Sequence, residues 1–101
     1  MTGGHDGAHD GAAVLRSARL LPDLLATDVQ HYAPFIADIA AALAAARHGA
    51  APPALHGNVY TLTLGKTGAH IVNGRDPSIA PETLSLEAFE AAFRHWTHPG
   101  S

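Results

Sequence analysis

The chain has 101 residues, the length of one domain, and its nine acidic and six basic residues give a net charge of −3 with histidine neutral. Its basic residues are scattered, which argues against a nucleic-acid partner, because such partners are bound through clustered cations. Cysteine is absent, so disulfides, thiolate metal sites and cysteine nucleophiles are excluded. No apolar run approaches the roughly 20 residues that span a bilayer, and no secretory signal is recognisable. We therefore expect a cytoplasmic protein without a membrane partner.

The first residues contain the unit His-Asp-Gly-Ala twice, at residues 5–8 and 9–12. This region holds four glycines and no large apolar residue after Met1, so it lacks contacts that would offset the entropy of ordering its backbone. We predict a flexible tail over residues 1–11, able at most to bind divalent metal weakly, and a single α+β domain over residues 12–98.

A first helix is predicted directly after this tail. Apolar residues recur at three- and four-residue intervals from Ala12 to Leu21, a spacing typical of an amphipathic helix, and Pro22 predicts a break there. Thr27 and Asp28 are candidate N-caps for the helix that follows.

That next helix covers the segment PFIADIAAALAAARHG, in which Pro34 suits the first turn and Gly49 is a natural C-cap. Seven alanines between residues 37 and 46 give the helix a smooth surface. Two interpretations stay open: simple helix propensity, or a face that contacts a neighbouring helix or a second copy of the chain.

A β-hairpin is predicted in the second half of the chain. The segment NVYTLTL, residues 58–64, alternates apolar and polar side chains, as a half-buried strand does, and residues 69–73 supply its partner. Gly65 and Gly68 are expected to take positive-φ positions in the turn. The tripeptide Gly-Lys-Thr in this turn is not a phosphate-binding loop, because no glycine stands five residues earlier and no helix follows.

The last predicted element is a helix that Ser85 caps. Its apolar face is formed by Leu86, Phe89, Phe93 and Trp96, which recur at helical spacing. The predicted fold is therefore an α+β domain in which N-terminal helices and a C-terminal helix pack on a small antiparallel β-hairpin sheet.

No group of residues with catalytic spacing is recognisable, so we expect a protein that is not an enzyme and that needs no cofactor. The function that this pattern favours is binding of another protein, either a different chain or a second copy in a homo-oligomer. The candidate contact residues are exposed groups near the hairpin and its turns: Tyr60, Lys66, His70, Arg75 and Asp76.

The alternative is a histidine-based site for a metal or another small ligand, because the chain has eight histidines. His95 and His98 stand three positions apart, at i and i+3, at the end of the last helix, a spacing that places two imidazoles on one side. A zinc site needs at least one further protein ligand, and the candidates are His31, His48, His56, His70 and Glu90. A third hypothesis is a carrier of apolar ligands beneath the aromatic face of the last helix.

Two segments carry a resemblance to known families. NVYTLTLGKTGAHIVNG and PETLSLEAFEAAFRHW, within residues 58–96, pair a hairpin with a helix that a serine caps and that carries spaced phenylalanines and a tryptophan. In this layout the chain resembles small bacterial immunity proteins of contact-dependent toxin systems. The resemblance implies binding of another protein, as an immunity-like or accessory subunit, and transfers no site residue. The same stretch is also similar to part of a sterol-carrier-type domain, which implies an apolar ligand.

Overall fold

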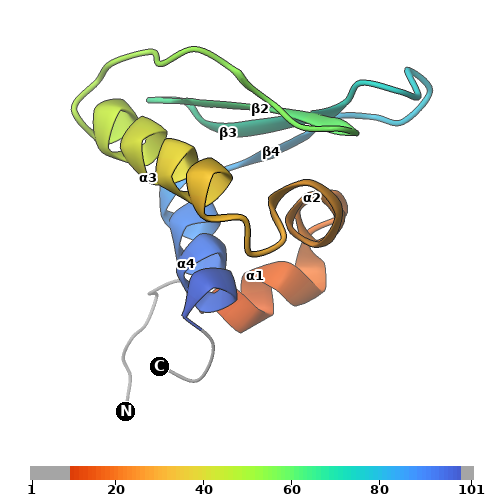
Figure 1. Ribbon diagram of the computed structural model, residues 1–101, viewed down its shortest axis with the longest axis horizontal. Coiled ribbons are helices and arrows are strands. Elements are labelled where there is room, and N and C mark those ends of the chain that lie inside the picture. Colours follow the sequence, from red (N-terminus) through yellow and green to blue (C-terminus); the bar gives the residue numbers. More distant parts are fainter. Residues whose placement is uncertain (1–9, 99–101) are drawn as a thin grey trace.

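The computed structural model describes residues 10–98 and has the predicted α+β architecture (Figure 1). The helical elements are α1 (Gly11–Ser17), α2 (Leu21–Leu24), the π-helical turn η1 (Leu25–Val29), α3 (Ala33–Arg47) and α4 (Leu86–Thr97). The strands are β1 (Leu55–His56), β2 (Tyr60–Gly65), β3 (Gly68–Asn73) and β4 (Glu82–Leu84). None of the helices in this described range is long and apolar enough to cross a membrane.

The four strands form one antiparallel sheet in the order β1-β2-β3-β4. Leu62 of β2 pairs with Leu55 of β1 and with Ile71 of β3, and Leu62 and Ile71 are fully buried. Thr61 and Thr63 point to the other face, so the predicted alternation of β2 is confirmed. The short strands β1 and β4 add to the predicted hairpin on either side.

The hairpin turn differs in one detail from the prediction. Gly65 pairs with Gly68, so Lys66 and Thr67 form a two-residue turn. Of the two turn glycines, only Gly68 has a positive φ, of 124°, in a position where a β-carbon would also collide with the backbone of Leu84. Gly65 has an ordinary strand conformation and open space beside it.

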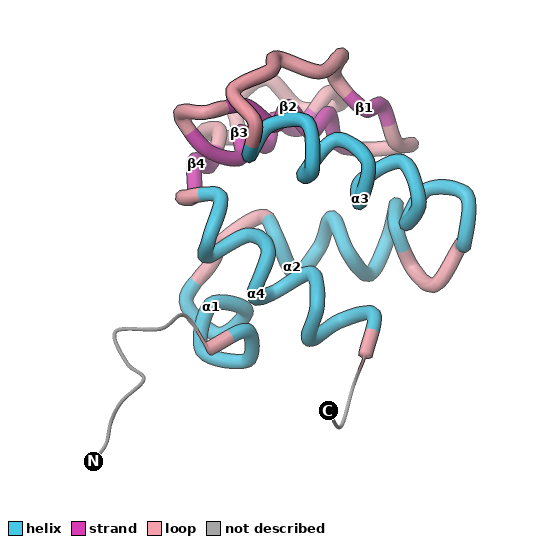
Figure 2. The backbone as a smooth tube through the Cα atoms, turned by 90° about the vertical axis from the view of Figure 1, so that its left-hand side faces the viewer, coloured by secondary structure: helices cyan, strands magenta, loops and turns pink. Residues whose placement is uncertain are grey.

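All helices lie on one side of the sheet, which Figures 1 and 2 show from two directions. α3 packs against β2, α4 packs against β3, and α1 contacts α4. One continuous hydrophobic cluster joins these layers, so the described residues form a single domain. Its largest fully buried side chains are Leu21, Leu24, Leu25, Val29, Ile39, Leu62, Leu64, Ile71 and Phe89.

The predicted start and apolar face of α4 are confirmed. The side chain of Ser85 accepts a hydrogen bond from the backbone N–H of Ala88, as an N-cap does. Phe89 and Phe93 are buried, and Leu86 and Trp96 are half-buried against the core. Trp96 also donates its indole N–H to the carbonyl oxygen of Gln30, at 2.5 Å, and stacks on the imidazole ring of His31.

The first helix is shorter than predicted because a distant carboxylate ends the helical path. α1 stops at Ser17, and Glu82 of β4 accepts hydrogen bonds from the backbone N–H groups of Arg19, Leu20 and Leu21, at 2.6–3.1 Å. These groups lie at the start of α2, where helix geometry leaves N–H groups without intrahelical partners. Glu82 therefore caps α2 from across the fold, a contact that local sequence patterns do not show.

Asp28 does not cap α3, which corrects the prediction. Its carboxylate is buried and accepts hydrogen bonds from the backbone N–H groups of Asn58, Val59 and Tyr60, at 2.7–3.1 Å. α3 begins later, at Ala33, and has no side-chain cap. The two buried carboxylates, Asp28 and Glu82, thus tie the α2 and η1 segment to the sheet.

The folded part of the chain begins slightly earlier than predicted. Asp10 caps α1 by accepting a hydrogen bond from the backbone N–H of Ala12, at 3.0 Å, and Gly11 is buried as the first residue of the helix. The second His-Asp-Gly-Ala unit therefore contains a helix start. Residues 1–9, where the rest of the predicted tail falls, lie outside the described residues.

Candidate functional site

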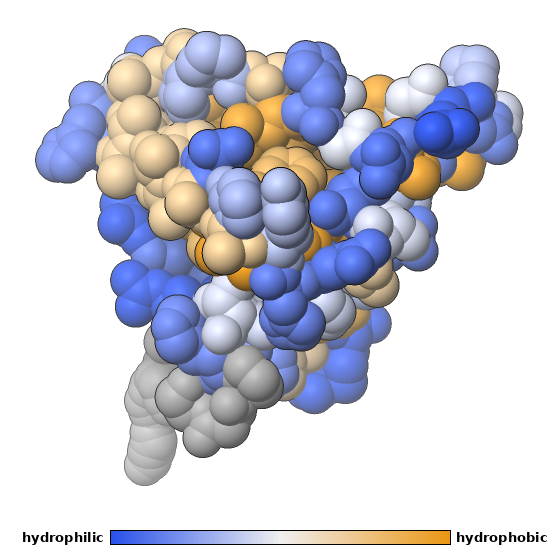
Figure 3. Space-filling model, viewed as in Figure 1, coloured by the Kyte–Doolittle hydropathy of each residue, from blue (hydrophilic) through white to orange (hydrophobic). Residues whose placement is uncertain are grey.

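The outward face of α3 is almost free of charge. Ile39, Leu43 and their neighbours face the core, while four alanines face outward: Ala37, Ala40, Ala41 and Ala44. We call these four residues the alanine ridge. Asp38 and Arg47 are the only charged residues in the 15-residue helix. In Figure 3 the pale orange surface over α3 is this apolar face. Helix propensity explains why alanine suits the positions, but it does not explain the near absence of polar residues from an exposed face.

A hollow of about 250 Å³ lies along one side of the alanine ridge. It is lined by residues of α3, of the following loop and of β1: Asp38, Ala41, Ala42, Pro52, Pro53 and Leu55. We call it the proline hollow. The two adjacent prolines hold the loop extended beside the helix, because proline fixes φ and restricts the residue before it.

A second hollow, of about 210 Å³, lies between α3 and α4 on the other side of the ridge. We call it the α3–α4 groove. Ala40 and Leu43 of α3 and Phe93 of α4 give it an apolar floor. Thr97 and His98 line it at the C-terminal end of α4, where the Thr97 hydroxyl donates to the carbonyl oxygen of Phe93, at 3.0 Å.

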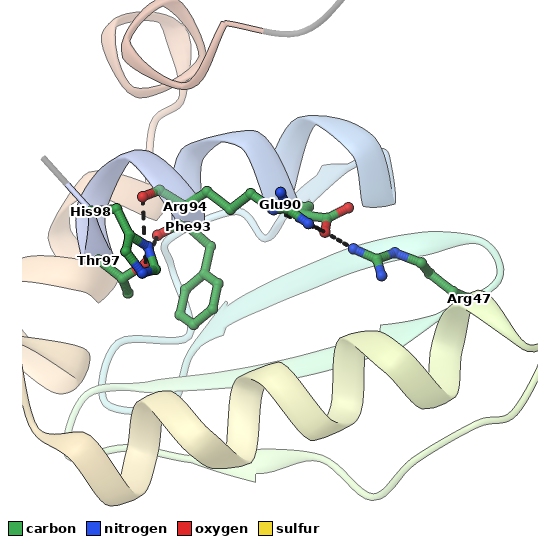
Figure 4. A network of polar contacts seen from close by, with 6 residues as sticks. All are labelled: Arg47, Glu90, Phe93, Arg94, Thr97 and His98. Carbon is green, nitrogen blue, oxygen red and sulfur yellow. Dashed lines mark hydrogen bonds and ion pairs between the residues drawn. The ribbon is translucent and has the colours of Figure 1, made fainter. Parts of the chain in front are cut away.

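Three charged side chains meet at the opposite end of the α3–α4 groove (Figure 4). Arg94 donates to Oε2 of Glu90 from Nε and Nη2, at 3.2 and 2.9 Å, one helical turn apart on α4. Arg47 reaches the same oxygen from the end of α3. The Glu90 side chain is 20 % exposed, whereas the side chains of Arg47 and Arg94 are 46 % and 71 % exposed. The cluster therefore has one net positive charge, presented to solvent.

Sequence reasoning missed this cluster. The four-residue spacing of Glu90 and Arg94 is a signal for a helix ion pair. Nothing in the sequence, however, brings Arg47 to the same carboxylate, because that contact depends on how α3 crosses α4.

The five predicted contact residues are not brought together. Lys66 lies in the turn at one end of the hairpin, and Arg75 and Asp76 lie in the loop beyond its other end. His70 is exposed on the sheet face that the helices leave uncovered. Tyr60 is 5 % exposed, which corrects its prediction as an exposed contact residue.

Tyr60 has a structural role instead. Its hydroxyl donates to the carboxylate of Asp23 on α2, at 2.6 Å. This hydrogen bond, together with burial and the charges of Asp23 and Asp28, raises the pKa of Tyr60 to about 12. The pKa of Asp76 is lowered, because its carboxylate accepts hydrogen bonds from the hydroxyl and the backbone N–H of Ser78. Asp76 thus orders its own loop.

The two histidines predicted as metal ligands lie in different surroundings. His95 is exposed on α4, beside the start of α1, and His98 ends the helix, where its Nδ1 atom lies 2.9 Å from the hydroxyl of Thr97. Within residues 10–98, no group of three or more histidine, aspartate or glutamate side chains has an arrangement that would hold a metal ion. Within the described part of the chain, the two histidines therefore lack the further protein ligand that a zinc site needs.

Comparison with protein-family models, with curated proteins and with solved structures finds no match to this chain. The findings thus define an α+β protein with a four-stranded antiparallel sheet and helices on one side. The resemblances to immunity proteins and to sterol-carrier-type domains stay predictions.

Proposed function

We propose that the protein is a non-catalytic binding module whose partner is a second copy of the same chain, bound through the alanine ridge of α3. The observation that carries this proposal is an exposed, nearly uncharged helix face that lies directly beside the proline hollow. Contiguous exposed apolar surface is a common feature of interaction sites in proteins. A cytoplasmic location stays a prediction.

Shape favours a second copy as the partner. The same surface contains a ridge and, next to it, a hollow whose lining is apolar except for Asp38. In a two-fold arrangement the ridge of each copy enters the hollow of the other, so one surface patch serves both subunits. Alanine side chains let two helices approach closely, because helix separation is set by the side chains at the contact.

The residue that precedes α3 is also exposed. Tyr32 is the only large hydrophobic residue of the described range that is strongly exposed, at 64 %. Its side chain brings an aromatic ring to the N-terminal end of the helix. Tyrosine is enriched at protein interfaces, since it contributes large contact area and loses little conformational entropy.

The experiment is to place a charge on the ridge and measure the molar mass in solution. Ala44→Glu and Ala37→Glu keep residues with good helix propensity but bury a carboxylate in the proposed contact. We expect the unmodified chain to have twice its 10.4 kDa mass by light scattering coupled to size exclusion, and both variants to be monomeric.

Ala80→Glu is the matched control, because Ala80 is exposed in the loop between β3 and β4, away from α3. It should leave the dimer intact. A dimer that survives both ridge substitutions would contradict the proposed surface, and a monomeric unmodified chain would contradict the proposed function.

A further inference from the structure

We infer that the α3–α4 groove binds a small monocarboxylate with a short apolar tail, whose carboxylate pairs with Arg47 and Arg94 and whose tail lies on Leu43 and Phe93. The groove shares Ala40 with the alanine ridge, but Leu43, Phe93 and the two arginines lie outside the ridge, so the inference does not rest on the proposed self-association. The inference rests on the charge, the floor and the size of the groove.

The net positive charge at one end of the groove favours binding of an anion. A single oxygen of Glu90 receives two guanidinium groups, which leaves one positive charge without compensation. Among the described residues, no group other than Glu90 pairs with Arg47, so its guanidinium keeps N–H donors for a ligand. A guanidinium binds carboxylates, and also phosphates, through two parallel hydrogen bonds, and the apolar floor beside the cations favours an anion that carries an apolar tail.

Glu90 lies between the two cations and its single charge neutralises only one of them. Its side chain is largely shielded, and it contacts one arginine from its own helix and one from α3, as Figure 4 shows. An ion pair that served only to fasten the helices together would need one arginine. The second cation overcompensates the carboxylate and draws a further anion to the end of the groove.

The apolar floor and the volume of the α3–α4 groove limit the polarity and the size of the ligand's tail. Leu43 and Phe93 present aliphatic and aromatic surface next to the charged end, as ligand sites usually combine apolar walls with a few polar groups. The volume of about 210 Å³ is below the range of roughly 300–1,000 Å³ that is typical of drug-sized ligands. A compact monocarboxylate fits this space, whereas a long acyl chain does not.

Phenylacetate is the probe that tests this site, with two matched compounds as controls. Phenylacetamide has the same shape without the charge, and acetate has the charge without the tail. We expect phenylacetate to shift the amide resonances of Leu43, Phe93 and Thr97 in a two-dimensional NMR titration, with a dissociation constant of about 1 mM or below. Both controls should bind at least about tenfold more weakly.

Substitutions separate a ligand site from a structural ion pair. Arg47→Gln and Arg94→Gln should each weaken phenylacetate binding about tenfold, because each removes charge-assisted hydrogen bonds. Glu90→Gln should tighten binding about fivefold or more, since it removes the negative charge that competes with the ligand. A site that depended on the intact ion pair would instead lose affinity in Glu90→Gln. Arg75→Gln, in the loop beyond the hairpin, is the control and should change nothing.

The spectra of the unliganded variants report folding, so loss of binding is interpreted only where the resonances stay dispersed. No saturable shift with phenylacetate at millimolar concentration would overturn the inference. Equal binding of phenylacetate and phenylacetamide would overturn it as well, as would weaker binding in Glu90→Gln.

Discussion

Gly11 at the start of α1 lies against the carbonyl group of Ala91 on α4, with no room for a side chain between the two helices. A β-carbon at Gly11 would collide with that carbonyl oxygen and would stand 2.6 Å from the β-carbon of His95. The glycine is thus part of a close helix crossing, which explains why a residue of low helix propensity begins a helix.

Gly11→Ala should therefore destabilise the fold by about 1–3 kcal/mol, the usual cost of overpacking a close contact. The usual effect has the opposite sign, because replacing a glycine inside a helix by alanine normally stabilises the fold by roughly 1 kcal/mol. The free energy of unfolding is measured by urea denaturation, with the fluorescence of Trp96 as the signal. Gly65→Ala is the control, because Gly65 has open space and an ordinary φ, and its free energy should change by less than about 1 kcal/mol. Equal effects of both substitutions would contradict the close crossing.

Glu82→Gln should cost about 2–3 kcal/mol of unfolding free energy, although the two side chains have nearly the same shape. The carboxylate accepts three backbone hydrogen bonds, and the amide replaces one of its oxygens with a donor that faces other donors. Urea denaturation again gives the value. Glu87→Gln, exposed in the first turn of α4, is the matched control and should cost less than about 1 kcal/mol. If the two substitutions cost the same, Glu82 does not cap α2 as described.

The hydrogen bond between Tyr60 and Asp23 predicts loss of stability at high pH. The pKa of Tyr60 is raised from 10.0 to about 12 in the folded chain, so the unfolded chain releases the phenolic proton first. The stabilisation is complete below pH 10 and declines as the pH rises from 10 through 12, because the folded chain then binds more protons than the unfolded chain. Tyr60→Phe lacks this contribution.

We expect the difference in unfolding free energy between the unmodified chain and Tyr60→Phe to be about 1 kcal/mol at neutral pH and to narrow above pH 10. The absorbance of tyrosinate in a Tyr32→Phe background gives the titration of Tyr60 directly, since the chain has two tyrosines. A difference that stays constant through pH 12, or a titration midpoint near 10, is incompatible with the buried hydrogen bond.

Local patterns in the sequence predicted the elements whose own residues specify them. The alternation of β2 and the Ser85 cap of α4 act over a few residues, and both are confirmed. The sequence did not predict the hydrogen bonds that join distant residues. The Glu82 carboxylate bonds to the start of α2 across more than 60 positions of the chain, and the Asp28 carboxylate bonds to the start of β2. The edge strands β1 and β4 are too short to show a period of two.

In the candidate site too, only the features that belong to a single element could be predicted from the sequence. The smooth alanine surface of α3 was visible in the sequence, because it belongs to one helix. The α3–α4 groove was not, because its walls and its charged end come from two helices that are far apart in the chain. The exposed position predicted for Tyr60 was wrong, since its aromatic ring completes the inner face of the sheet and its hydroxyl finds a carboxylate on α2.

We propose that α3 joins two copies of the chain through the alanine ridge, and sedimentation velocity of the unmodified protein distinguishes this dimer from a monomer. The average mass should rise with protein concentration towards twice 10.4 kDa, and the Ala44→Glu variant should sediment as a monomer at the same concentrations. A single 10.4 kDa species at every concentration, in the unmodified chain as in the variant, would contradict it.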